Sequence, residues 1–216
     1  MEMSSDGQTV SDWSNFKNDA QANNLRHRDN LLTPGKIGNA LSLSGANHRG
    51  FLYVPDYPKT EFNELTVSAW IQARSRPRWA TIVKNWGTNA WGQFHFGLNE
   101  KGYLDAEFMT NDHEKVHITA KDKFPLNSWQ HVAFVHKGSE VILYNNGQVI
   151  ARGKVNGINS HGQLRSLGIG TKISDQDQGQ RSVIPGHWDG YLDEVAIFNH
   201  ALSQEQIHDL YQMANN

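Results

Sequence analysis

Asp105 and Glu107 form the acidic pair whose spacing comes nearest to that of a catalytic pair in this sequence. A retaining glycosidase needs two carboxyl groups about 5–5.5 Å apart, one to donate a proton and one to attack the sugar. The two acids alternate with Leu104, Ala106 and Phe108, so a strand here turns the apolar residues to the core and the acids to the other face. We therefore expect both acids to be solvated. The sequence also lacks a Gly-x-Ser-x-Gly elbow, so it does not indicate an enzyme.

Histidine is abundant, with 11 copies in 216 residues, and invites a search for metal ligands. His113 and His117 are four positions apart, which in a strand separates them by roughly 13 Å. His131 and His136 fall on opposite faces of a predicted strand. The sequence contains no His-Glu-x-x-His motif and no cysteine, so the common zinc signatures are missing. We expect scattered structural or surface roles for the histidines.

Aromatic side chains in predicted loops indicate a different chemistry. A sugar ring presents apolar C–H faces that stack on indole, while its hydroxyl groups need hydrogen-bonding partners. The candidate ligand-binding residues are Trp79, Trp86, Trp91, Arg76, Arg78, Asn89, His95, His187 and Trp188. The same tryptophans could instead cover sheet edges, and the sequence leaves both interpretations open.

Asp193 interrupts an apolar face of the strand predicted over residues 191–198. Alternation places one set of side chains on one face, Leu192, Ala196 and Phe198, and a second set on the other, Tyr191, Asp193, Val195 and Ile197. A carboxylate among apolar neighbours must be paired, hydrogen-bonded or bound to a metal, because burying it bare is too costly. Asp193 therefore needs a partner.

Composition excludes several classes of partner. The 20 basic and 22 acidic side chains give a net charge of −2, which argues against nucleic acid or an anionic membrane as the main ligand. No apolar run approaches the roughly 18 residues of a membrane span. Residues 1–7 lack the basic and apolar regions of a signal peptide.

Short strands separated by turn signals dominate the chain. About a dozen are predicted, over residues 40–43, 51–54, 65–73, 80–84, 94–98, 103–109, 116–120, 129–136, 141–144, 148–152, 166–170 and 191–198. No composition shift divides the sequence. The pattern predicts one all-β domain over residues 1–216, folded as a two-sheet antiparallel jelly-roll sandwich.

Both ends of the chain are expected to depart from the strand pattern. The polar stretch 6–33 should wrap the surface, tied down by Val10, Trp13 and Phe16. At the other end, Ser203 and Gln206 form a capping box, which predicts a short C-terminal helix.

Several segments, in order, resemble the laminin-G-like jelly-roll family of the concanavalin A-like lectin and glucanase superfamily. Residues 65–71, Leu-Thr-Val-Ser-Ala-Trp-Ile, match that family's Phe-Thr-Val-Ser-Ala-Trp-Val, and residues 190–195, Gly-Tyr-Leu-Asp-Glu-Val, match its Gly-x-Ile-Asp-Glu-Val. Further matches cover residues 38–43, 51–55, 81–84, 127–133, 141–147 and 201–203. One departure is the family's opening strand, Trp-x-Phe-Asp-Glu, which is absent or reduced to residues 3–6.

The resemblance implies a concanavalin A-like fold of two curved antiparallel sheets, with Trp70 and Trp129 at core positions. Glucanases of the superfamily carry Glu-x-Asp-x-Glu or Glu-x-Asp-x-x-Glu on one strand, and neither motif occurs here. Several relatives hold a structural Ca²⁺ ion between the N-terminal loop and the last strand. The candidate metal ligands in this chain are Asp193, Asp12, Asn15 and Asn18. The alternative is that Asp193 accepts backbone N–H bonds or pairs with a basic side chain.

These observations favour a non-catalytic binding module that recognises a glycan or glycoprotein, as a monomer and without membrane insertion. We expect it to belong to an exported bacterial protein that works outside the cell or in the periplasm. The alternatives are an adhesion or structural module with a protein partner and, less favoured, a glycan-cleaving enzyme. Fold alone does not decide among them.

Overall fold

The computed structural model describes residues 2–4, 7–23, 32–47, 49–57, 64–86, 92–159, 166–173 and 186–214. Sheet A consists of β1 (Thr9–Val10), β2 (Ala20–Asn23), β5 (Phe51–Val54), β7 (Thr81–Lys84), β8 (Phe94–Leu98), β9 (Tyr103–Met109), β10 (Lys115–Lys123) and β14 (Leu167–Ile169). Sheet B consists of β3 (Leu32–Pro34), β4 (Asn39–Ser44), β6 (Glu64–Ala73), β11 (Gln130–Lys137), β12 (Glu140–Asn145), β13 (Gln148–Lys154) and β15 (Asp189–Phe198). A 3-10 turn, η1 (Gly45–Asn47), follows β4, and the helix α1 (Gln204–Met213) follows β15.

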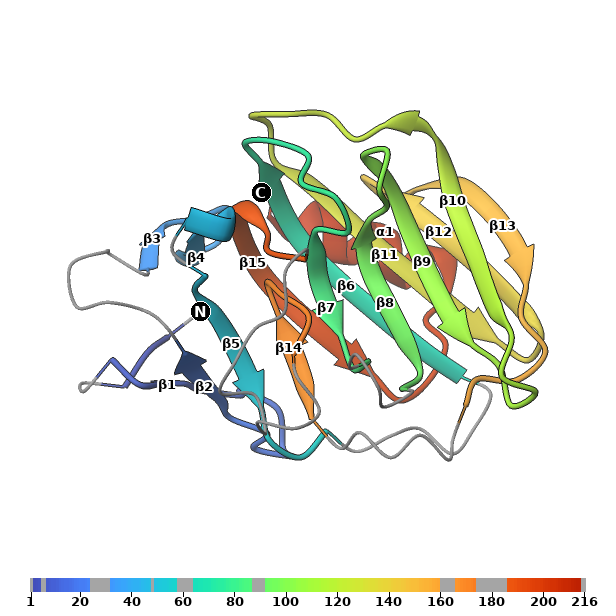
Figure 1. Cartoon of the computed structure of the whole chain (residues 1–216), viewed down its shortest axis with the longest axis horizontal. Coiled ribbons are helices and arrows are strands. Elements are labelled where there is room, and N and C mark those ends of the chain that lie inside the picture. The colour runs from blue at the N-terminus through green and yellow to red at the C-terminus, as the bar shows by residue number, and fades with distance from the viewer. Residues whose placement is uncertain are drawn as a thin grey trace.

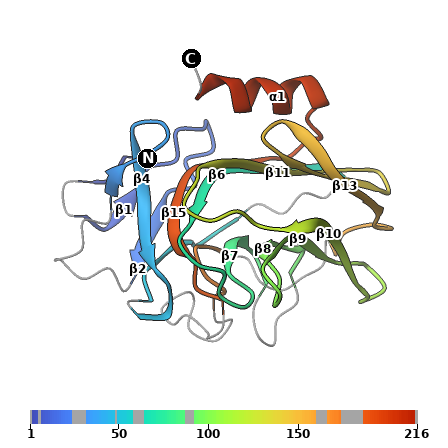
Figure 2. The same ribbon diagram turned by 90° about the horizontal axis from the view of Figure 1, so that it is seen from above.

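The two sheets stack face to face (Figures 1 and 2). The strand order is β1-β2-β5-β14-β7-β8-β9-β10 in sheet A and β13-β12-β11-β6-β15-β4-β3 in sheet B. All paired strands within the described residues are antiparallel, and their order departs repeatedly from the order in the chain. The predicted all-β jelly-roll sandwich is confirmed.

The core between the sheets is centred on aromatic side chains. Phe134 of β11 meets Phe94, Phe96 and Phe108 of sheet A, with ring centroids 5.4, 5.3 and 5.1 Å away. All three pairs are edge-to-face, the arrangement that the charge distribution of aromatic rings favours. Because the side chains of β8 and β9 alternate, these phenylalanines require their strand neighbours to point out of the sandwich.

Helix α1 lies on the outer face of sheet B (Figure 2). The predicted capping box is confirmed, with Ser203 accepting from the Gln206 N–H and the Gln206 side chain accepting from the Ser203 N–H. Ile207 is fully buried, and Tyr211 stacks on Trp70 with ring centroids 5.7 Å apart.

Two tryptophans expected at core positions lie outside the space between the sheets. Trp70 is buried, but under α1 on the outer face of sheet B. Trp129 is half-buried, with its ring 6.1 Å from that of Tyr191. The core position is therefore wrong for Trp129, and Trp70 is buried by the helix instead of by the opposing sheet.

A β-bulge in β15 changes which residues share a face. Asp193 pairs with Trp70 and Ala196 pairs with Ser68, so two residues of β15 oppose one of β6, and Glu194 has a φ of 45°. The extra residue reverses the alternation. Leu192 therefore shares the core face with Val195 and Ile197, and the predicted grouping of Leu192 with Ala196 and Phe198 is wrong.

The N-terminal stretch is held by backbone pairing and small apolar residues, not by its aromatic residues. β1 pairs with β2, β2 pairs with β5, and Val10 and Ala20 are buried. Trp13 and Phe16 are 71% and 70% exposed, so the expectation that they tie the stretch down is wrong. Met3 forms an isolated bridge with Val10. In the described part of the chain, no helix is long and apolar enough to cross a membrane.

Candidate functional site

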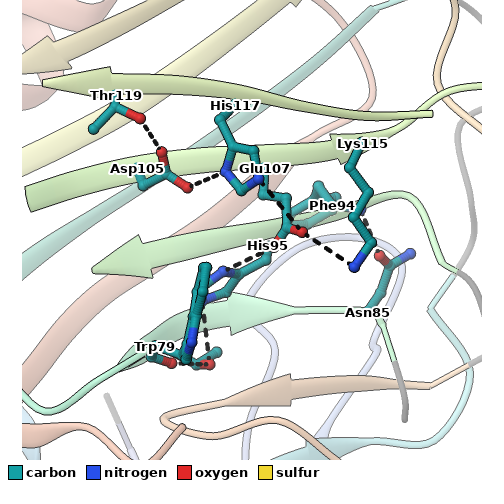
Figure 3. A network of polar contacts seen from close by, with 10 residues as sticks. Trp79, Asn85, Phe94, His95, Asp105, Glu107, Lys115, His117 and Thr119 are labelled. Atoms are coloured by element: carbon teal, nitrogen blue, oxygen red, sulfur yellow. Dashed lines mark hydrogen bonds and ion pairs between the residues drawn. The ribbon is translucent and has the colours of Figure 1, made fainter. Parts of the chain in front are cut away.

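Four titratable side chains form a line across the outer face of sheet A. Lys84 of β7 pairs with His95 of β8, His95 pairs with Glu107 of β9, and Glu107 pairs with His117 of β10. Residues directly opposite in adjacent strands point to the same face. We call these four residues the polar row; Figure 3 shows His95, Glu107 and His117 on neighbouring strands.

A second line of paired residues supports the polar row. It contains Thr81, Gly97, Asp105 and Thr119. Asp105 accepts hydrogen bonds from His117 Nδ1, at 2.9 Å, and from the Thr119 hydroxyl (Figure 3). A Cβ atom at Gly97 would lie 2.1 Å from the Ala80 carbonyl oxygen, so only glycine fits there.

Asp105 and Glu107 are buried, and the expectation that they are solvated is wrong. Their side chains are 0% and 7% exposed. Glu107 carboxylate oxygens lie 3.7 Å from His95 Nδ1, 3.8 Å from Lys115 Nζ and 3.8 Å from His117 Nε2. The neighbouring strands thus supply basic partners that compensate for the lost water.

Proton affinities along the row follow from these contacts. Burial acts to raise the pKa of Glu107, but contact with His95 and the charge on Lys84 outweigh it, and the pKa falls to about 2. Burial lowers the pKa of His95 to about 4 and that of Lys84 to about 8. The hydrogen bond to Asp105 raises the pKa of His117 against the opposing effect of burial. Near neutral pH, His95 is therefore neutral and Glu107 charged.

Two of the predicted ligand-binding tryptophans lie beside the polar row. The ring of Trp79 is 6.4 Å from the rings of both His95 and His117. Lys84 Nζ and Lys115 Nζ lie 5.0 and 4.8 Å from the centroid of the Trp86 ring. Trp79 is half-buried and Trp86 almost fully buried, so Trp79 is the ring open to a ligand.

The side chain of Asn85 links the end of β7 to the start of β8. The Asn85 side-chain oxygen accepts the backbone N–H groups of Gln93 and Phe94 at 2.9 and 3.0 Å. These bonds join the end of β7 to the start of β8 beside the polar row.

The other candidate ligand-binding residues of the described chain are either bonded to other groups or buried. Arg76 Nε donates to the Phe124 carbonyl at 2.6 Å, and Arg78 forms a 3.2 Å ion pair with Glu100. Trp188 packs in the core between the sheets, so it cannot stack on a ligand, and His187 beside it is buried too. Asn89 and Trp91 lie outside the described residues.

Sequence analysis missed most of the polar row. Of its members only His95 was a candidate ligand residue. His95 and His117 are not scattered as expected, because both lie beside Glu107. The positions of the turns could have revealed which residues of the polar row pair with one another. A turn centred near residue 101 pairs 95 with 107, and one centred near 112 pairs 107 with 117. Within the described residues, no group of three or more His, Asp or Glu is placed to hold a metal ion.

The predicted calcium ligands lie in two places. Asp12, Asn15 and Asn18 belong to the loop between β1 and β2, where Asp12 accepts the N–H groups of Ser14 and Asn18 at 2.8 Å. Asp193 accepts the N–H groups of Lys36, Ile37 and Glu194, each at 2.9 Å.

The contacts of Asp193 fit the hydrogen-bonded alternative better than metal coordination. A Cβ atom at Gly35 would lie 2.5 Å from Asp193 Oδ2, so a glycine lets the loop between β3 and β4 close over the carboxylate. Burial raises the pKa of Asp193 against these hydrogen bonds. Both carboxylate oxygens are aimed at N–H donors, whereas calcium needs oxygens aimed at the ion. Calcium binding itself stays a prediction.

The fold and site define a lectin-like jelly-roll domain. Residues 45–208 match the profile of the concanavalin A-like lectin/glucanases superfamily. The chain belongs to this superfamily, as the laminin-G-like motifs suggested. No curated protein is detectably similar in sequence.

Several solved structures are similar to this chain in fold. One is domain 4 of AbnA, a GH43 extracellular arabinanase from Geobacillus stearothermophilus, in complex with arabinotriose; the TM-score is 0.67 at 20% identity, over 89% of this chain and 88% of that one. Another is the heptameric SAP-like pentraxin of Limulus polyphemus, with a TM-score of 0.59 at 21% identity, over 79% of this chain and 80% of that one. A third is botulinum neurotoxin type C, whose cell entry depends on two ganglioside molecules; the TM-score is 0.66 at 17% identity, over 96% of this chain and 50% of that one. At these identities the likeness shows the fold alone.

Proposed function

We propose that the chain is a non-catalytic carbohydrate-binding module whose ligand lies over the polar row on the outer face of sheet A. The observation that carries the proposal is the line of four paired, titratable side chains with a tryptophan ring beside it. Sugars are recognised by this combination of a stacking ring and directional polar groups.

The accessible end of the row supplies the contacts to the sugar. The side chains of His117 and Lys115 are 39% and 58% exposed, and Trp79 is half-buried beside them. His95 and Glu107 lie underneath and hold these groups in place. Because the row is ordered by its own contacts, little side-chain entropy is lost on binding.

The state of the carboxylates supports binding without catalysis. A glycosidase needs one carboxyl group that is protonated near neutral pH and can donate to the leaving oxygen. The pKa of Glu107 is lowered to about 2, and Asp105 is fully buried while it accepts hydrogen bonds from His117 and Thr119. Neither acid has the setting of a proton donor to a sugar.

The fold relatives support the ligand class. Domain 4 of the arabinanase was solved with arabinotriose, and the type C neurotoxin interacts with gangliosides. The arabinanase is extracellular, which accords with a proposed exported location for this chain.

Affinity electrophoresis tests the proposal. Native gels containing arabinan, xylan or laminarin should retard the wild type, and Trp79→Ala and His117→Ala should each weaken retardation at least about tenfold. Trp129→Ala is the matched control, because it removes a half-buried tryptophan from the opposite sheet. Equal retardation of all three variants and the wild type would reject the site. Sugar release from any of the polymers by the wild type would reject the non-catalytic assignment.

A further inference from the structure

The loop between β1 and β2, residues 11–19, presents two aromatic rings to solvent. Trp13 and Phe16 are 71% and 70% exposed, whereas the other exposed large hydrophobic side chains among the described residues, Ile37 and Met213, stand singly elsewhere. Exposing two rings three positions apart leaves apolar surface in water, and such a patch commonly marks a contact surface. The polar row does not use this loop.

The loop is ordered by its own hydrogen bonds. Asp12 accepts from the Ser14 N–H, the Ser14 hydroxyl and the Asn18 N–H at 2.8, 2.7 and 2.8 Å. The Asp12 N–H donates to Asp19 at 2.8 Å, and the Phe16 N–H donates to Ser14 Oγ at 3.1 Å. These bonds fix the backbone that carries Trp13 and Phe16, so binding pays little backbone ordering entropy.

The size of the patch argues against a protein partner. Two aromatic side chains bury about 300–500 Å² at most, whereas a standard protein interface takes about 800 Å² from each partner. The chain neighbours of Trp13 and Phe16, namely Ser14, Asn15 and Lys17, are exposed and polar.

The charges argue against an anionic membrane. The loop carries two acids, Asp12 and Asp19, against one base, Lys17, whereas surface binding to anionic lipid uses clusters of basic residues. What remains is a ligand that stacks on one or two rings and hydrogen-bonds to neutral polar groups. A sugar chain has that chemistry, and Asn15, which lies between Trp13 and Phe16 in the sequence, offers an exposed amide.

We propose that the β1–β2 loop is a second carbohydrate contact, in which Trp13 and Phe16 stack on sugar rings and Asn15 bonds their hydroxyl groups. The inference rests on the proposed function for the class of ligand but not for its site. In sheet A, β2 and β8 are four strand positions apart, which is about 20 Å at the usual strand spacing. The two contacts are therefore separate, and a polysaccharide that engages both would bind more tightly through avidity.

The test compares variants of each contact in native gels containing arabinan, xylan or laminarin. The loop variant is Trp13→Ala with Phe16→Ala, and the variant of the polar row is His117→Ala. Met213→Ala is the control, because it removes an equally exposed apolar side chain elsewhere, at 68% exposure. A further variant, Trp13→Tyr with Phe16→Tyr, keeps stacking rings in place. All the altered side chains are exposed, and unchanged melting temperatures will show that each variant folds.

We expect the loop variant to lose at least about tenfold in affinity for the polymer that retards the wild type most, through lost avidity. The tyrosine variant and Met213→Ala should bind as the wild type does. Retardation of the loop variant equal to that of the wild type would overturn the inference and leave the proposed function standing. Loss in the loop variant with none in His117→Ala would support the loop and overturn the site on the polar row.

Three other results would overturn the sugar assignment of the loop. One is a wild type that no polymer retards, which would overturn both proposals. The second is wild-type binding to vesicles of equal phosphatidylcholine and phosphatidylserine that the loop variant lacks. The third is concentration-dependent dimerisation that the loop variant abolishes.

Discussion

Protonation of His131 should destabilise the protein in mild acid. The side chain is 2% exposed, and its ring lies 5.5 Å from Trp70 and 6.4 Å from Tyr211. Its Nδ1 has no hydrogen-bond partner among the described residues. Burial lowers the pKa of His131 from 6.5 to about 4, because removing the ring from water disfavours its charged form.

The size and sign of the effect follow from linkage. The folded state binds the proton less readily than the unfolded chain, so the stability contributed by a neutral His131 is complete above pH 6.5 and is lost as the pH falls toward 4. The difference between the two pKa values corresponds to about 3 kcal/mol once both states are protonated, and to about 2 kcal/mol at pH 5.

Urea unfolding of wild type and His131→Phe at pH 7.5 and pH 5.0 measures this contribution. Phenylalanine keeps an aromatic ring beside Trp70 and Tyr211 but cannot take up a proton. The free energy of unfolding should fall by about 2 kcal/mol more in the wild type than in the variant between the two pH values. His95 and His187, two buried histidines whose pKa is also lowered to about 4, titrate in both proteins and cancel in the comparison.

The matched control is His200→Phe, which replaces an exposed histidine. It should keep the wild-type difference between pH 7.5 and pH 5.0. If His131→Phe also keeps that difference, then water or a rearranged partner reaches His131 on protonation, and the argument from burial fails.

Three further predictions concern the acids and one glycine. Changing Asp105 to Asn and Glu107 to Gln together should weaken polysaccharide binding at least about tenfold in native gels, because the positions of His117 and Lys115 depend on these carboxylates; unchanged retardation would contradict this. Asp193→Asn should lower the free energy of urea unfolding by about 1–3 kcal/mol, because an amide cannot accept three N–H bonds as the carboxylate does. Thermal melts with calcium and with chelator test the metal prediction. If calcium binds, it should raise the melting temperature of the wild type by about 5–10 °C and leave that of Asp193→Asn unchanged. An unchanged wild-type melting temperature would leave Asp193 as a hydrogen-bonded acid. Gly97→Ala should lower the free energy of unfolding by about 1–3 kcal/mol, since its methyl group would collide with the Ala80 carbonyl. A urea midpoint equal to that of the wild type would contradict this and show that β7 can shift.

Hydrophobic alternation and turn chemistry made most of the fold predictable. The strand over 51–54 and the strand over 103–109 have the predicted bounds, and Ser203 starts the helix with the predicted cap. These features depend on neighbours in sequence, so local patterns carry them.

The site depends on register between strands, which alternation on one strand does not reveal. His95, Glu107 and His117 each lie between two apolar residues of their own strand. Seen on one strand alone, these three therefore look like solvated residues of the outer face. Only their pairing across β8, β9 and β10 shows that they lie side by side. The bulge at Glu194 could not be predicted for a related reason. The extra residue of β15 is recognised only from the pairing of this strand with β6.

The position of α1 determines how the domain can be attached to a solid support. The helix lies on the outer face of sheet B (Figure 2), while the polar row lies on the outer face of sheet A. The spacing of the sheets and the width of a helix put about 20 Å between them. A biotin or cysteine tag added after α1 would therefore fix the domain to a sensor chip with the polar row turned toward the flowing analyte. A tag placed in the 110–114 turn between β9 and β10, beside the polar row, would turn that face toward the chip.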